Sequence, residues 1–193
     1  VLMGSGEPLD NYGNVCKFLS LASDENGLNI SRRNVSLSTC GLCDKIRQLA
    51  DDGYTPTMTI SLHAPNDVMR QEIMPIAKKY SIDDIIGAVK YYFQKTGRRI
   101  IFEYSMINGK NDGESCAIQL AEKVKGLACH INLIQLNYVK ERGLSGSSKK
   151  NIYRFMSILE KNGVSVTVRR SMGGDIDGAC GQLRRKVISD ENN

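Results

Sequence analysis

The chain has 193 residues, of which 41% are hydrophobic and 24% are charged, and its formal net charge is +5. This length suits one domain with a sizeable core, and no apolar run reaches the roughly 18 residues of a transmembrane helix. No charged-then-apolar leader opens the chain, and its six cysteines have no compact spacing. We therefore expect a cytoplasmic protein with reduced thiols and no membrane contact.

Strand-like and helix-like segments alternate along the chain. In the first part, residues 1–3, 34–38 and 57–62 predict strands, and residues 14–21 and 44–50 predict helices. A helical turn at 68–73 precedes a strong helix that Ser81 caps and Gly97 ends. In the second part, strands are predicted at 99–106, 130–136 and 164–169, and helices at 114–125 and between Ser148 and Gly163.

The spacing of apolar residues predicts which side of each helix faces the core. The inward side chains expected from this spacing are Val15, Phe18, Leu19, Ile82, Ile85, Ile86, Val89, Phe93, Ile118, Ala121, Val124, Ile152, Phe155, Met156 and Leu159.

Alternating β and α units predict an α/β fold with a parallel sheet and helices outside it. The alternation does not distinguish an open doubly wound sheet from a barrel. Every candidate motif follows a predicted strand, and parallel-sheet folds place their active sites at the carboxyl ends of the strands. We expect one catalytic domain over residues 1–188 and a disordered tail over 189–193.

Cys180 is a candidate for covalent chemistry. It lies between Ala179 and Gly181, and small neighbours leave a sulfur approachable and let the backbone bend tightly. A cysteine kept only for packing would more often lie inside an apolar run. Asp175 and Asp177 precede it, and we expect them to position its loop or to meet Arg169 and Arg170.

The segment Gly-Ser-Gly-Glu-Pro at residues 4–8 follows the first predicted strand. Gly6 lets the backbone approach a ligand closely, and Glu7 can accept hydrogen bonds from an ammonium group. The alternative is a tight turn in which Glu7 lies near the start of a helix and needs no ligand.

Two further strand ends carry polar candidates. Ser38 ends the second predicted strand, where it could bind a ligand or cap the next helix. Residues 61–67 read Ser-Leu-His-Ala-Pro-Asn-Asp, and His63 could donate to a ribose hydroxyl or a carboxylate. The alternative for His63 is a core histidine bonded to backbone. The other histidine, His130, is expected to be structural.

Three more features have open interpretations. Asn137, after the strand at 130–136, has an amide that could pair with an adenine or a ribose. Glu103 ends a neighbouring strand and either lines the barrel or pairs with an arginine. Cys40 and Cys43 form a Cys-Gly-Leu-Cys pair, which we interpret as ordinary thiols rather than half of a redox or zinc site.

Taken in order, these motifs resemble the radical S-adenosylmethionine RNA methyltransferases of the RlmN/Cfr family. The strings at 61–67 and at 175–183, Asp-Ile-Asp-Gly-Ala-Cys-Gly-Gln-Leu, are the most specific part of the likeness. The resemblance implies a parallel partial β/α barrel of the radical SAM type, incomplete at its N-terminus. It implies that Cys180 is catalytic and carries the methyl group. The cofactor-binding residues that it implies are Gly6, Glu7, Ser38, Ser61, Leu62, His63 and Asn137.

The resemblance also implies S-adenosylmethionine and a [4Fe-4S] cluster as cofactors, with flavodoxin or ferredoxin as electron donor. Members of this family hold the cluster on a Cys-x3-Cys-x2-Cys loop, and no three cysteines of this chain have that spacing. We therefore expect the C-terminal part of a longer enzyme, without metal ligands and inactive by itself.

The implied reaction is methylation of C2 of an adenosine in 23S rRNA and in tRNA. The alternatives are a Cfr-type C8 methyltransferase, which confers antibiotic resistance, and a non-catalytic α/β RNA-binding module. The positive charge of the chain suits RNA binding under each of these functions. Basic pairs recur at 32–33, 78–79, 98–99, 149–150, 169–170 and 184–186, although most such pairs are solvated helix ends or loops.

Overall fold

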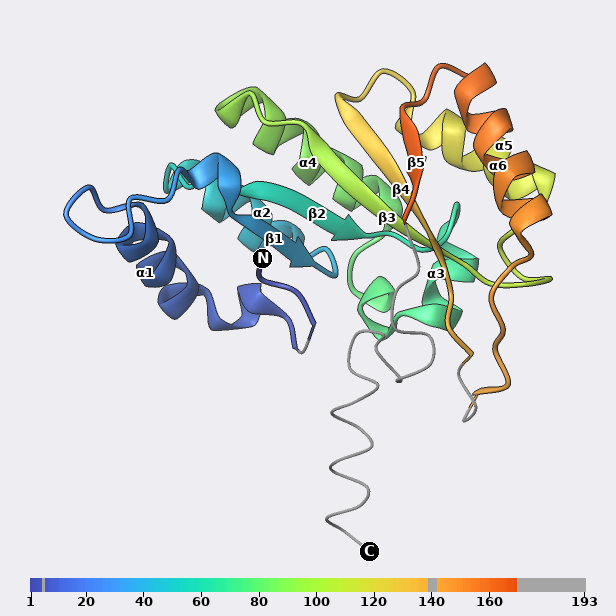
Figure 1. Ribbon diagram of the computed structural model, residues 1–193, viewed down its shortest axis with the longest axis horizontal. Coiled ribbons are helices and arrows are strands. Elements are labelled where there is room, and N and C mark those ends of the chain that lie inside the picture. The colour runs from blue at the N-terminus through green and yellow to red at the C-terminus, as the bar shows by residue number, and fades with distance from the viewer. Residues whose placement is uncertain (5, 139–141, 170–193) are drawn as a thin grey trace, which may run out of the picture.

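The computed structural model of the chain, which describes residues 1–4, 6–138 and 142–169, contains one parallel sheet of five strands. The strands lie side by side in chain order (Figure 1): β1 (Ser36–Thr39), β2 (Thr57–Ser61), β3 (Ile100–Met106), β4 (Cys129–Gln135) and β5 (Val166–Val168). At the free edge of β1, Leu2 forms an isolated parallel bridge with Leu37. The predicted α/β fold with a parallel sheet is confirmed.

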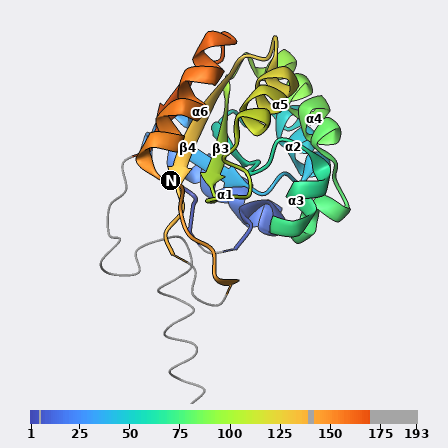
Figure 2. The same cartoon turned by 90° about the vertical axis from the view of Figure 1, so that its right-hand side faces the viewer.

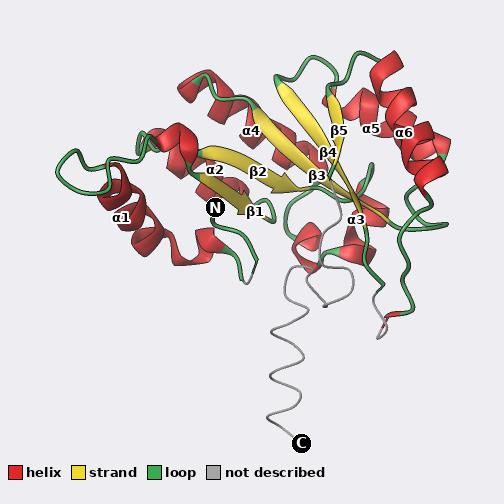
Figure 3. Ribbon diagram, viewed as in Figure 1, coloured by secondary structure: helices red, strands yellow, loops and turns green. Residues whose placement is uncertain are grey.

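The helices lie outside the sheet (Figures 2 and 3). They are α1 (Tyr12–Ser23), α2 (Cys43–Asp51), α3 (Asp67–Ile73), α4 (Ile82–Thr96), α5 (Glu114–Val124) and α6 (Lys149–Lys161), with the 3-10 helices η1 (Pro8–Asn11), η2 (Arg32–Asn34) and η3 (Pro75–Lys78). Within the described residues, none of these helices combines the length and the apolar character needed to cross a bilayer.

Helix α4 begins and ends where the sequence predicts. The Ser81 hydroxyl accepts a hydrogen bond from Asp84 N, and the Asp84 carboxylate accepts one from Ser81 N, which completes a capping box. Gly97 ends the helix in the left-handed conformation, with φ 65°, which glycine adopts without steric cost.

Three side chains predicted to face the core do not. Phe18, Phe93 and Ile118 are 45%, 40% and 41% exposed. On α4 the inward position falls to the neighbouring Tyr92, which is buried and donates its hydroxyl proton to Pro56 O. On α5, Leu120 and two alanines already fill the space against the sheet. The buried stripe of each helix is therefore narrower than its apolar sequence suggests.

The two faces of the sheet differ in character. Along each strand, buried apolar residues alternate with less buried, mostly polar ones, whereas a parallel sheet covered on both faces usually has nearly continuous apolar strands. The apolar face packs against the helices in one core. On the opposite face, strand register places four polar side chains in a line across the sheet, here called the polar row: Ser61, Glu103, Asn132 and Thr167.

We expect Ser81→Ala to lower the free energy of unfolding by about 1 kcal/mol, because it leaves the backbone N–H of Asp84 without its side-chain acceptor. Urea denaturation monitored by circular dichroism measures this change. Ser115→Ala, an exposed position in the first turn of α5, is the control and should change stability by less than about 0.5 kcal/mol. Equal effects of the two substitutions would contradict the capping role.

Candidate functional site at the carboxyl edge of the sheet

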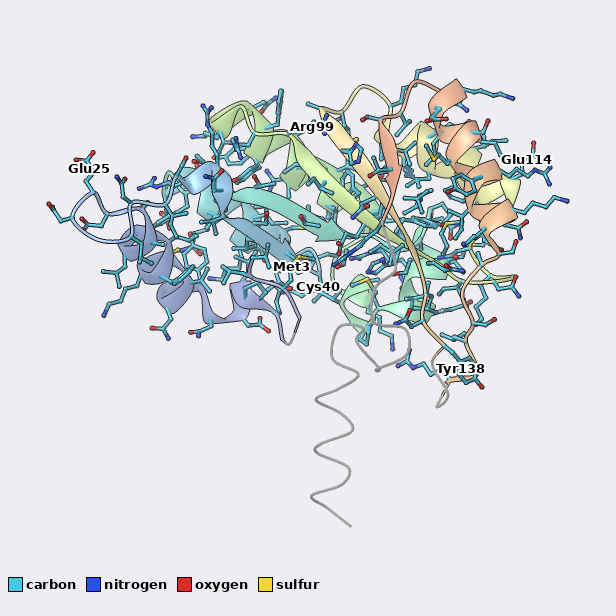
Figure 4. The ribbon with its side chains drawn as sticks, viewed as in Figure 1. Met3, Glu25, Cys40, Arg99, Glu114 and Tyr138 are labelled. Atoms are coloured by element: carbon cyan, nitrogen blue, oxygen red, sulfur yellow. The ribbon has the colours of Figure 1, made fainter. Side chains whose placement is uncertain are left out.

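The predicted site residues collect at the carboxyl ends of the strands. Ser38 is the last but one residue of β1, Ser61 ends β2, and Asn137 lies two residues beyond β4. Because all strands are parallel, these ends share one edge of the sheet. Figure 4 shows Met3, Cys40 and Tyr138 along this edge and Arg99 at the opposite one.

Glu7 is fixed to the end of β1. Its Oε2 accepts a hydrogen bond from Cys40 N at 2.7 Å, and its Oε1 accepts one from Leu9 N at 3.0 Å. The second bond makes Glu7 the cap of η1, so the turn that the sequence offered as an alternative is present. Each carboxylate oxygen has a further lone pair, so the group can still accept a hydrogen bond from a cation. Gly6, with φ +80°, supplies a backbone conformation that other residues rarely adopt.

His63 uses one ring nitrogen in a structural hydrogen bond and keeps the other as a donor for a ligand. Its Nδ1 accepts a hydrogen bond from Ser105 N at 3.1 Å, which in a neutral ring places the proton on Nε2. Its backbone is left-handed, with φ 59°. Burial, with the charge of Arg70, lowers the pKa of His63 to about 4, so the ring is neutral at physiological pH. Nε2–H is thus available as a neutral donor at the carboxyl edge.

Arg70 organises the ends of β1 and β2, and nothing in the sequence pointed to it. It is 0% exposed, although it lies in the short helix α3. Its Nη2 donates to Cys40 O at 2.8 Å and to Ser61 O at 3.3 Å, while Nε donates to Leu62 O and Nη1 to Tyr80 O. Basic residues are mostly exposed, so the sequence gives no sign that this one is buried.

Asn111 is a second buried residue that the sequence analysis missed. Its Nδ2 donates to His63 O and to Ser105 O, both at 2.8 Å, and its Oδ1 accepts from Ile107 N at 2.7 Å. The side chain therefore holds the left-handed His63 against the end of β3. An asparagine in a turn is usually exposed, so only the structure reveals this role.

The remaining predicted residues contribute in different ways. Ser38 and Ser61 are half-buried on the polar face, and Asn137 is half-buried beyond β4. The Leu62 side chain is 1% exposed in the core, and its carbonyl oxygen already accepts from Arg70 Nε, so only the second lone pair of that oxygen could meet a ligand. Leu62 N and His63 N both donate to Glu103 O, which ties the end of β2 to β3.

Glu103 pairs with an arginine, which is one of its two alternative interpretations, and it lies in the middle of β3 and not at its end. It lies in the polar row and also pairs with Arg169, whose Nη1 is 3.3 Å from Glu103 Oε1. Burial raises the pKa of Glu103, and the positive charge of Arg169 opposes that shift. His130, by contrast, bonds through both ring nitrogens to the hydroxyls of Ser165 and Thr167, which is the structural role expected for it.

The cysteines of the described region are shielded thiols. Burial and the Glu7 carboxylate raise the pKa of Cys40 to about 12, and burial raises that of Cys43 to about 11. Both are therefore protonated near neutral pH, as ordinary thiols are. Across residues 1–4, 6–138 and 142–169, no group of three His, Cys, Asp or Glu side chains could hold a metal ion. Cys180, Asp175 and Asp177 lie outside the described residues.

We expect Arg70→Met to destabilise the protein by about 3 kcal/mol or more, because it leaves several buried carbonyl groups without donors. The stability of Arg70→Lys should lie between that of wild type and that of Arg70→Met, since an ammonium keeps the charge but lacks the planar guanidinium fork. Urea denaturation is the measurement. Arg154→Met removes an exposed arginine that pairs with Glu114 and should change stability by less than about 0.5 kcal/mol. If Arg70→Met behaves like Arg154→Met, the organising role is wrong.

We expect His63 to make stability depend on pH. Because folding lowers its pKa from the ordinary 6.5 to about 4, the unfolded chain binds the proton more readily in this window. Stability from this source is complete above about pH 6.5 and is lost as the pH falls towards 4, on the order of 2–3 kcal/mol in total.

The measurement is the free energy of unfolding of wild type and His63→Asn between pH 4 and pH 7. Asparagine tolerates the left-handed backbone and does not titrate. His130, whose pKa is also lowered by burial, remains in both proteins, so the difference between them isolates His63. A difference that stays constant with pH would contradict the assignment.

Comparison with known proteins shows which family the chain resembles. The family model described as the Radical SAM superfamily matches residues 1–121. The probable dual-specificity RNA methyltransferase RlmN of Lachnospira eligens is 56% identical over 190 residues, which are 98% of this chain and 54% of the relative. That of Clostridium perfringens is 55% identical over 188 residues, which are 97% of this chain and 54% of the relative.

Solved structures agree with the sequence comparisons. A radical SAM methyltransferase from Sphaerobacter thermophilus matches with a TM-score of 0.89 and 40% identity, covering 93% of this chain and 53% of that one. A domain of a pyruvate-formate lyase-activating enzyme from Bacteroides vulgatus shares the fold, with a TM-score of 0.65 and 16% identity. The chain spans about half the length of the curated relatives it matches. It belongs to the radical SAM superfamily.

Proposed function

We propose that this chain is part of the catalytic domain of a radical S-adenosylmethionine RNA methyltransferase that methylates C2 of adenosine in 23S rRNA and tRNA. The observation that carries the proposal is the carboxyl edge of the sheet. There Glu7 is bonded to the end of β1, Arg70 joins the ends of β1 and β2, and Asn111 holds His63. The similarity to relatives named as RNA methyltransferases supports the same conclusion.

The residues at this edge fit S-adenosylmethionine. The cofactor has an ammonium, a carboxylate, ribose hydroxyls and an adenine, so it needs both acceptors and donors. Glu7 offers an acceptor, and His63 Nε2–H offers a neutral donor. The hydroxyls of Ser38 and Ser61 and the amide of Asn137 can act in either sense. We assign cofactor binding to these side chains and to the backbone of Gly6 and Leu62.

Cys180 is the proposed methyl carrier. When bound, S-adenosylmethionine supplies an electrophilic methyl group. In the proposed step the Cys180 thiolate attacks that carbon, so a sulfur–carbon bond forms as the bond to the sulfonium breaks. Cys180 is left as a thioether beside neutral S-adenosylhomocysteine. A covalent carrier is needed because C2 of adenine is not nucleophilic and cannot take the methyl group by direct polar transfer.

The iron–sulfur cluster does not fit the described part of this chain, which lacks a set of metal-ligating side chains. We therefore derive no step through it and assign it to the part of a longer enzyme outside this chain, since the matching relatives are about twice as long. RNA is the proposed partner, and the net charge of +5 favours contact with phosphates.

In the complete enzyme, we expect Cys180→Ala to abolish methylation of adenosine, because no sulfur remains to carry the methyl group. Mass spectrometry of nucleosides from treated 23S rRNA and tRNA measures the product and distinguishes C2 from C8 methylation. Cys116→Ala, at a buried position in α5, is the control and should remain active. Methylation that persists in Cys180→Ala would contradict the carrier role, and a C8 product would contradict the proposed position.

A further inference from the structure

The loop after β3 and the segment before α6 lie against each other at the carboxyl edge of the sheet. Gly146 forms an antiparallel bridge with Ile107, and Asn108 N donates to Ser145 O at 2.9 Å. Backbone bonds therefore hold the start of the loop after β3 against the chain that leads into α6.

Asp112 connects the end of the same loop to the start of α6. Its Oδ2 accepts hydrogen bonds from the Ser147 hydroxyl at 2.7 Å and from Asn151 Nδ2 at 3.3 Å, and its Oδ1 accepts one from Gly109 N at 3.0 Å. Ser147 is 0% exposed, so its bond to Asp112 is shielded from water. The loop after β3 and the first turn of α6 therefore keep a fixed relative position.

Three exposed lysines belong to this joined surface, and they are here called the basic rim: Lys110, Lys149 and Lys150. Lys110 lies in the loop after β3, and the other two are the first residues of α6. Lys110 is next to Asn111, whose Nδ2 donates to His63 O at 2.8 Å. The loop that carries Lys110 is thus in direct contact with the candidate site.

The positive charges of the basic rim have no anionic partner in the described part of the chain. None of the ion pairs among the described residues involves these lysines. The acidic side chains beside them are already engaged, because Asp112 is bonded to Ser147 and Asn151, and Glu114 pairs with Arg154. The rim therefore has an excess of positive charge that an anionic ligand would neutralise.

Other basic pairs of the chain have structural contacts. Arg32 donates to a backbone carbonyl, Lys79 lies over the ring of Tyr80, and Arg98 donates to the hydroxyl of Thr57. Among the described residues, the lysine pair at the start of α6 has no contact of these kinds. The structure of the chain therefore does not account for this pair.

The position of Lys149 and Lys150 is unfavourable for α6 itself. The amino end of a helix has a partial positive charge, so acidic residues stabilise the first turn and cations destabilise it. Helices α2, α3, α4 and α5 each have an acidic residue there, whereas α6 has none and begins with the two lysines. Residues that reduce the stability of their own helix indicate a role outside folding.

We propose that the basic rim binds the phosphate backbone of the RNA substrate next to the site where the adenosine is methylated. The inference rests on the proposed function, because it takes RNA as the partner. It adds the surface that RNA contacts and the mode of contact. Lysines bind phosphates as point charges, so the contact is independent of base sequence and depends strongly on salt.

The experiment measures RNA binding by variants of the complete enzyme at several salt concentrations. The probes are a fluorescein-labelled RNA hairpin with an adenosine in its loop and a second hairpin of scrambled sequence. Replacing both Lys149 and Lys150 by glutamine should weaken binding of both hairpins by about 10-fold at about 0.1 M salt. It should also reduce the slope of log affinity against log salt by about 1 to 2.

Two further rim variants test whether charge is the cause. Replacing Lys149 and Lys150 by arginine keeps both charges and should leave affinity within about 2-fold of wild type. Lys110→Gln removes one charge and should change the salt slope about half as much as the double glutamine variant.

The matched control replaces Lys125 and Lys161 by glutamine, which removes the same charge from exposed positions at the opposite ends of α5 and α6. Lys161 is about 18 Å from Lys149 along the helix, roughly twice the Debye length at physiological salt. The control should therefore change RNA affinity by less than about 2-fold.

Thermal unfolding separates a binding role of the rim from a structural one. Replacing Lys149 and Lys150 by glutamine should leave Tm unchanged or raise it, because two unfavourable charges are removed from the first turn of α6. The expected result is thus lower RNA affinity in a protein that is at least as stable as wild type.

Equal RNA affinity of the rim and control variants would overturn the inference. A loss of affinity that comes with a lower Tm, or that leaves the salt slope unchanged, would also overturn it. Each of these results, with methylation by the wild type intact, would leave the proposed function standing. A wild-type enzyme that neither binds nor methylates RNA would overturn both.

Discussion

The buried guanidinium of Arg70 is the interaction on which the arrangement of the site depends. Where parallel strands end, their last carbonyl groups lose their partners in the sheet, and a buried carbonyl without a donor is costly. Arg70 donates to Cys40 O, Ser61 O and Leu62 O, and so supplies the ends of two adjacent strands from one planar group. Burial lowers the pKa of Arg70, yet a guanidinium remains charged in proteins. Within the described residues its four hydrogen bonds all go to carbonyl groups, and Asp67 favours its charge without forming an ion pair with it.

The one-sided sheet explains how a domain of this size can have both a stable core and a polar site. The apolar face of the strands and the buried faces of the helices form one continuous core. The opposite face is then free to carry polar side chains, and the row from Ser61 to Thr167 crosses four strands at matching register. Polar groups on this face bond to one another, as the pairs of His130 with Ser165 and of Glu103 with Arg169 show.

Much of the fold was predictable from the sequence, because alternating strands and helices with clear caps leave few arrangements. Ser81 and Gly97 bound α4 as expected, since caps are local features. The inward faces of α4 and α5 were predicted less well, because Phe93 and Ile118 are apolar but compete with Tyr92 and Leu120 for limited space.

The site was predictable only in part. The strand-end motifs led to Glu7 and His63 as candidates, because residues at the carboxyl ends of parallel strands share one edge. Arg70 and Asn111 could not be found, because their roles arise from burial and from contacts between distant segments. A sequence read residue by residue gives no measure of either.

Asn111 and Asp112 are neighbours in the chain, yet they hold different loops. Asn111 binds the carbonyl of His63 after β2, and Asp112 binds the hydroxyl of Ser147 before α6. Two adjacent side chains in the loop after β3 thus connect the loops on either side of it. Opening the loop after β3 breaks bonds to both of the others, so we expect these three loops to open together in local unfolding. We expect a ligand that orders any one of them to stabilise the whole carboxyl edge, so that binding at one end of the site would raise affinity at the other.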